Sequence, residues 1–246
     1  MAITLDSMVK ISTLSQNANT QVVDVFKRAN ERIGQQLSVT DVQLSAFGQI
    51  KAGFADIQAA GKSLSDPKKT STVEDVTKAA QSFADAYNNT TKAINTATKG
   101  DGKASGALTD DSRARLAGND LKKVVTSDNN MADLKKIGIN VNQDGMMSVD
   151  AKALQNAMQA NPNAVRDTFA KIGQQAEQIS KKELANTGNV GNAVNTLNTR
   201  AKNLEAQMAE QQKVAAASQA TVQRQVASIG NNAAGGVAAY MQMFSL

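Results

Sequence analysis

The chain has 246 residues, of which 41% are hydrophobic but only 3% aromatic, and it contains neither histidine nor cysteine. Histidine is the usual general base and the commonest metal ligand, and cysteine supplies thiol nucleophiles and zinc ligands. Their absence predicts that the chain is not an enzyme and binds no cofactor or metal. The net charge is +5, but the basic residues are spread out without interleaved aromatics, so no nucleic-acid partner is expected.

The first predicted element is a long helix. Residues 1–21 are rich in Ser, Thr and Asn and predict a flexible segment. Over 22–64, apolar residues recur at steps of three and four, which is the period of a coiled coil. Three residues interrupt this pattern: Thr40, Lys51 and Gly61. Ile50 can cover the gap at Lys51, and Pro67 predicts the end of the helix.

Two shorter helices are predicted next. The first, over 72–97, has Ser71 and Glu74 before and within its first turn, at the spacing of a capping box. A glycine-containing loop follows, and a second helix is predicted over 110–126. The paired acids Asp110 and Asp111 lie where that helix begins, so we expect them to cap it.

The pattern then changes from helical to alternating. Alternating apolar residues over 137–149, interrupted by turn residues, predict a β-hairpin. Helices are predicted over 151–160 and 162–185, with Asp150 and Asn161 as N-caps. We expect this segment to form the one conventional small core, with these side chains buried: Ile137, Ile139, Val141, Leu154 and Phe169. The hairpin turn resembles half of an EF-hand loop, but Ala151 stands where calcium needs an acid.

The last predicted helix covers 190–230 and has the most regular three-four period. Its apolar face contains much Ala, Gln and Ser, so it buries little apolar area and needs a partner. The glycines and asparagines of 231–236 are expected to end it, which leaves 231–246 as an apolar assembly tail. The residues predicted to mediate self-assembly are Leu204, Met208, Val222, Ile229, Tyr240, Met243 and Phe244.

These elements predict a mainly α fold, with long N- and C-terminal coiled-coil-like helices and a small α+β segment between them. The segment 22–230 is expected to be a single core domain. The long helices, 22–64 and 190–229, are expected to pack against each other in opposite directions. No apolar stretch is long enough for a membrane span, and no secretory signal is visible at the N-terminus.

Several segments resemble, in order, the conserved core of the flagellar filament-capping family, also called hook-associated protein 2. The strongest is LKKIGINVNQDGMMSVDAKALQNAMQANPNAVRDTF at 134–169. The others are ERIGQQLSVTDVQLSAFGQIKAGFADIQAAGKSL at 31–64, EDVTKAAQSFADAYNNTTKAIN at 74–95, GALTDDSRARL at 106–116 and LNTRAKNLEAQMAEQQ at 197–212. Family members carry large outer domains where this chain has only 62–72, so it resembles a minimal form.

The resemblance implies a homo-oligomeric ring, usually a pentamer, at the tip of the flagellar filament. It implies that flagellin is a partner whose folding and insertion the ring promotes, and that hook-associated junction proteins are possible neighbours. It also implies an extracellular location, reached through the flagellar type III channel without a cleaved signal peptide. A hook–filament junction protein, and a cytoplasmic coiled-coil adaptor or export chaperone, remain open alternatives.

Overall fold

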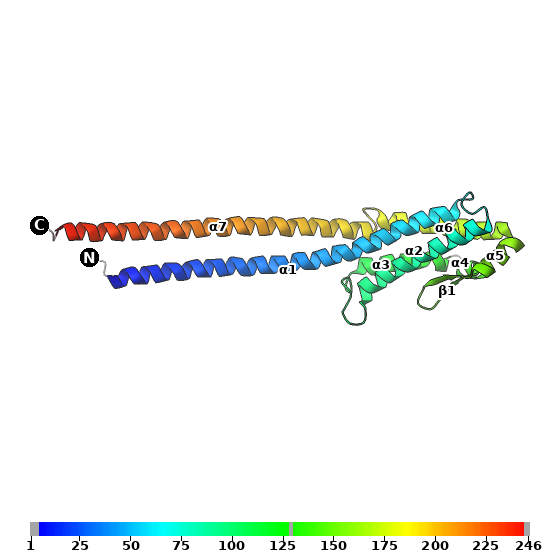
Figure 1. The fold of residues 1–246 in the computed structure, drawn as a ribbon, viewed down its shortest axis with the longest axis horizontal. Coiled ribbons are helices and arrows are strands. Elements are labelled where there is room, and N and C mark those ends of the chain that lie inside the picture. Colours follow the sequence, from blue (N-terminus) through cyan, green and yellow to red (C-terminus); the bar gives the residue numbers. More distant parts are fainter. Residues whose placement is uncertain (1–4, 128–129, 244–246) are drawn as a thin grey trace. The chain divides into compact units, whose positions relative to one another are not determined.

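The computed structural model describes the backbone of residues 5–127 and 130–243, and most side chains outside 5–22 and 229–243. The elements are α1 (Leu5–Ser65), α2 (Val73–Lys99), α3 (Ser112–Thr126), α4 (Asn130–Lys136), β1 (Ile139–Val141), β2 (Met147–Val149), α5 (Ala151–Ala160), α6 (Pro162–Leu184) and α7 (Asn189–Met243). Figure 1 follows them from blue to red. The prediction of a mainly α fold with one β-hairpin between long terminal helices is confirmed.

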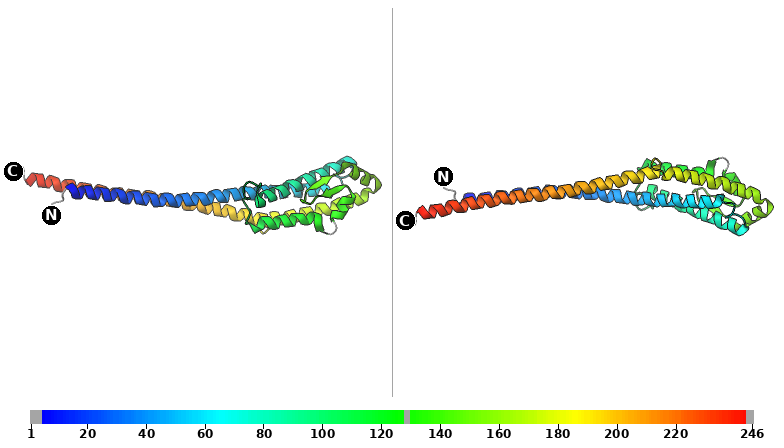
Figure 2. Two further views of the ribbon diagram at one scale, coloured as in Figure 1. Left: turned by 90° about the horizontal axis from the view of Figure 1, so that it is seen from below. Right: turned by 90° about the horizontal axis from the view of Figure 1, so that it is seen from above.

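The chain divides into two units. Residues 40–199 form one, called the compact unit here. The part of α1 up to Val39 and the part of α7 from Arg200 form the other, called the helical ends. Within the helical ends, the two helices run side by side in opposite directions (Figures 1 and 2). The structure divides the residues of the predicted core domain, 22–230, between these two units.

Both terminal helices are longer than predicted. Helix α1 begins at Leu5 rather than near Val22, so the helix extends into the segment 1–21 that was predicted to be flexible. Helix α7 continues to Met243, so the prediction that 231–236 ends it was wrong. Neither stretch contains proline, which is the residue that stops a helix. Glycine or asparagine within a helix costs only about 0.5–1 kcal/mol, so these residues weaken a helix without ending it.

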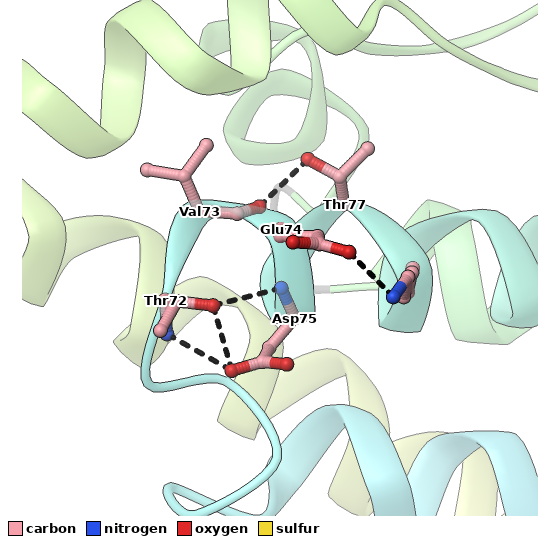
Figure 3. Close-up of polar contacts among 6 residues, drawn as sticks. Thr72, Val73, Glu74, Asp75 and Thr77 are labelled. Atoms are coloured by element: carbon pink, nitrogen blue, oxygen red, sulfur yellow. Dashed lines mark hydrogen bonds and ion pairs between the residues drawn. The ribbon is translucent and has the colours of Figure 1, made fainter.

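The start of α2 differs by one residue from the predicted capping box (Figure 3). Thr72 is the N-cap, and its Oγ1 accepts a hydrogen bond from the Asp75 backbone N–H at 3.1 Å. Asp75 Oδ2 in turn accepts from Thr72 N at 3.3 Å and from Thr72 Oγ1 at 2.7 Å. The predicted pair, Ser71 and Glu74, has the same spacing, but Glu74 forms an ion pair with Lys78 instead. The hydrogen bonds from Thr72 and Ser71 lower the pKa of Asp75.

The predicted caps of α5 and α6 are confirmed. Asp150 Oδ1 accepts from Ala153 N at 3.0 Å, and Asn161 Oδ1 accepts from Ala164 N at 3.1 Å, with Pro162 in the first turn of α6. Helix α4 was not predicted, because a two-turn helix carries too short a pattern to recognise.

The core of the compact unit is larger than predicted. Phe47 and Phe54 of α1 and Phe83 and Tyr87 of α2 are fully buried, in the same cluster as Phe169 of α6. The core is therefore not confined to the hairpin and the helices that follow it, because α1, α2, α3 and α7 also turn apolar faces inward. An aromatic-poor chain builds this core by placing most of its few aromatic side chains inside it.

The hairpin is held from the side by one asparagine. Strands β1 and β2 are antiparallel, with Ile139 opposite Val149. The Asn88 side chain on α2 donates to Met147 O at 2.8 Å and accepts from Met147 N at 2.7 Å, so it satisfies both backbone groups of that strand residue. Ile137, Ile139, Leu154 and Phe169 are buried as predicted, whereas Val141 is only half-buried.

Candidate self-assembly surface

The candidate surface follows the three-four period of α7. Between 201 and 228, the residues that are not exposed are Ala201, Leu204, Met208, Gln211, Ala215, Ser218, Gln219 and Val222. All except Gln219 continue the three-four spacing predicted for this helix, so the pattern located this face correctly as far as Val222; the next position in the spacing, Gln225, is exposed. We call Ala201, Leu204, Met208, Gln211, Ala215, Ser218 and Val222 the α7 seam.

Burial along the α7 seam decreases toward the C-terminus. Ala201 and Leu204 are buried, with 9% and 5% of their surface exposed, whereas Met208 and Val222 are only half-buried. Ile229, the next predicted assembly residue, lies on the helix, but its side chain is outside the described residues. The same holds for Tyr240 and Met243, and Phe244 lies outside the described residues altogether.

Helix α1 provides a matching face in the helical ends. Ile33 is buried at the predicted spacing, and Phe26 and Leu37 are half-buried. Both faces are therefore only partly covered. Since burial of apolar area contributes about 25 cal/mol per Å², a seam of Ala, Gln and Ser stabilises a single pair of helices weakly.

Sequence reasoning missed a second set of apolar side chains on the helical ends. Val25 and Val39 on α1 expose 64% and 55% of their surface, and Val214 and Val226 on α7 expose 44% and 40%. They could have been recognised in the sequence, because these valines occur at helix positions outside the three-four spacing, where most residues are polar. Apolar residues on more than one side of a helix indicate contact with more than one neighbour.

Asp111 and the half EF-hand turn have structural roles. Asp111 is the N-cap of α3 and forms an ion pair with Arg113 at 2.7 Å. Burial alone would raise the pKa of Asp111, but hydrogen bonds from Arg113 outweigh it and lower the pKa. In the half EF-hand, Asn142 Oδ1 accepts from Met146 N at 2.9 Å, and Gly145 adopts a φ of 78° that suits a turn.

Among the side chains that the structure describes, no group of three or more acidic, histidine or cysteine residues could hold a metal ion. Over the same residues, no helix is both apolar and long enough to cross a bilayer. The half-covered faces of the helical ends are therefore the candidate functional surface of the described residues.

A comparison with protein families decides the class of the chain. The family model described as flagellar hook-associated protein 2 C-terminus matches residues 67–240, which is well over half of the chain. The chain belongs to the flagellar hook-associated protein 2 family. This is a family of structural proteins of the flagellar filament tip. The comparison with curated proteins found no match.

The hook-associated protein 2 match begins in the link between α1 and α2 and includes the hairpin and nearly all of α7. The link is short, because α1 ends at Ser65 and α2 begins at Val73. It is also held in place, since Arg166 of α6 donates to Thr70 O at 3.2 Å and to Ser71 O at 3.1 Å. The link between α1 and α2 is thus a short turn that α6 holds closed.

Proposed function

We propose that this chain assembles into a homo-oligomeric ring, expected to be a pentamer, that caps the flagellar filament and promotes the folding and insertion of flagellin. Its partners are then further copies of itself, flagellin and, at the hook end, the junction proteins. The proposal places the chain outside the cell, after export through the flagellar type III channel.

The observation that carries the proposal is the half-covered apolar surface of the helical ends. Met208 and Val222 continue a seam that one partner helix covers incompletely, and Val25 and Val214 lie outside that seam. Full burial of one valine stabilises an interface by roughly 1.5 kcal/mol. Several such contacts, repeated around a ring, supply what a single chain lacks.

The C-terminal segment 231–246 has an assembly role in this proposal. Tyr240, Met243 and Phe244 would bind neighbouring subunits, because this last part of α7 has too little apolar surface of its own to compensate for the conformational entropy that an ordered helix loses. Deletion of 237–246 should leave the stability of the monomer nearly unchanged. It should weaken the oligomer and leave secreted flagellin unpolymerised.

Location on the cell separates the proposal from its alternatives. Fluorescent labelling of the protein on motile cells should mark filament tips. Signal at the base of the filament would favour a junction protein, and signal confined to the cytoplasm would favour an adaptor or export chaperone. Normal filaments from the truncated protein would refute the role of the tail.

A matched set of substitutions tests the helical ends directly. The double change Val25→Thr and Val214→Thr keeps the side-chain shape and removes apolar surface from the helical ends. Val42→Thr is the control, because Val42 is 55% exposed but lies in the compact unit. Sedimentation velocity should show weaker oligomers for the double variant alone, with equal thermal stability of the monomers. Equal oligomers in all three proteins would contradict the proposal.

A further inference from the structure

The corner between α6 and α7 contains a buried acid. Glu183, in the last turn of α6, has 0% of its surface exposed. Its Oε1 accepts a hydrogen bond from Asn189 Nδ2 at 2.9 Å, which joins the end of α6 to the first residue of α7. Its Oε2 is also buried and receives no hydrogen bond from the described residues. A buried carboxylate oxygen without a donor is costly, so the ionised form fits this site poorly.

A second acid, Asp120 of α3, lies at the same end of α6, because Lys182, the sequence neighbour of Glu183, forms an ion pair with it. Its Oδ1 accepts from Lys123 Nζ and its Oδ2 from Lys182 Nζ, each at 2.6 Å. Two carboxylates cannot hydrogen-bond to each other, because neither carries a proton to donate. A hydrogen bond between the two acids therefore needs a proton on Glu183, and Oε2 is the buried Glu183 oxygen that is free to carry it.

We propose that Glu183 is kept as a neutral carboxylic acid whose proton is donated to Asp120, and that this proton makes the α6–α7 corner a pH-dependent latch. The latch connects α7 to α3 through Asn189, Glu183 and Asp120. Loss of the proton places two negative charges together in a buried site, and Lys123 and Lys182 are already paired with Asp120. From α7, the neutral Asn189 side chain acts on Glu183.

The electrostatics agree with this geometry. Burial is the largest cause that raises the pKa of Glu183, and the hydrogen bond and charge of Asp120 raise it further, against the opposing effects of Asn189 and Lys182. Above the ordinary value of 4.5, the unfolded chain loses this proton while the folded chain retains it. The contribution of Glu183 to stability is therefore intact at acid pH and is lost as pH rises through the folded-state pKa.

The test compares the full-length chain with its Glu183→Gln variant. The glutamine keeps the shape of the acid and can donate to Asp120, but it does not titrate. The ratio of the unfolding constant of the wild type to that of the variant should rise with pH above 4.5, by up to about tenfold per pH unit. Urea denaturation followed by circular dichroism at pH values from about 4 to 8 measures this ratio.

Glu177→Gln is the control on the same helix. Glu177 forms an ion pair with Lys181 at 2.6 Å, which lowers the pKa of Glu177. The ratio of the wild-type unfolding constant to that of Glu177→Gln should therefore not rise with pH over this range. Carbon-13 NMR of labelled glutamate carboxyls adds a direct readout, in which Glu183 should titrate at higher pH than Glu177. A ratio independent of pH, or a Glu183 signal that titrates together with that of Glu177, would overturn the proposal.

Discussion

Helix α1 crosses α6 within the compact unit at a pair of glycines, and a single methyl group should disrupt this crossing. A Cβ added at Gly173 would lie 2.3 Å from the Gly61 carbonyl oxygen and 3.0 Å from Ser65 Cβ. The first of these atoms belongs to the backbone of a helix and cannot move by rotating a side chain. Gly61, which only interrupts the apolar pattern in the sequence, is thus what allows the close approach of the two helices.

The magnitude of the effect follows from this geometry. Relief of the contact requires the helices to separate by about 1 Å, and such overpacking costs about 1–3 kcal/mol. Because the contact is to backbone, we expect a cost near the upper end of that range. Replacement of a helical glycine by alanine regains roughly 1 kcal/mol. Gly173→Ala should therefore lower the free energy of unfolding by about 2 kcal/mol.

Gly48→Ala provides the control on α1. A Cβ at Gly48 meets no atom within 4 Å, so this variant should be more stable than the wild type by up to about 1 kcal/mol. Urea denaturation followed by circular dichroism gives both free energies under one set of conditions. Equal stabilisation by the two substitutions would show that α1 and α6 do not cross closely, and the reasoning would fail.

Three further substitutions and one chelation test probe other parts of the chain. Phe169→Ala should cost roughly 3–5 kcal/mol in urea denaturation, and a loss below about 1 kcal/mol would mean that Phe169 is not in a tight core. Asn88→Ala leaves the buried Met147 backbone groups unpaired and should cost about 1–3 kcal/mol, with faster amide exchange at Met147 by NMR. Asp120→Asn should lower the free energy of unfolding by about 2 kcal/mol at neutral pH. Burial alone would raise the pKa of Asp120, but hydrogen bonds from Lys123 and Lys182 lower it to about 2. Asp120 makes this contribution at pH values above 3.8, the ordinary pKa of its carboxyl, so the cost of the substitution should shrink as pH falls toward 2. A cost that does not change with pH would refute this prediction. EDTA should leave the melting temperature unchanged, and a fall would reveal a metal site.

Elements that depend on near neighbours in the chain were predictable from the sequence. The three-four period located the buried face of α7, and the same period in α1 identified Ile50 as the substitute for Lys51. Asp150 and Asn161 were recognisable as caps because an N-cap bonds to a backbone N–H only a few residues away. The order of the resembling segments also indicated the family that the comparison establishes.

The remaining features depend on residues that are distant in sequence, so only the tertiary structure decides them. The contact of Gly61 with Gly173, the hydrogen bonds of Asn88 to Met147 and the ion pair of Lys182 with Asp120 all join separate elements. Local patterns carry no information about which of many similar glycines, asparagines or acids will meet. The sequence by itself therefore determined the helices, their apolar faces and the family, whereas packing determined the extent of the core and which polar side chains act together.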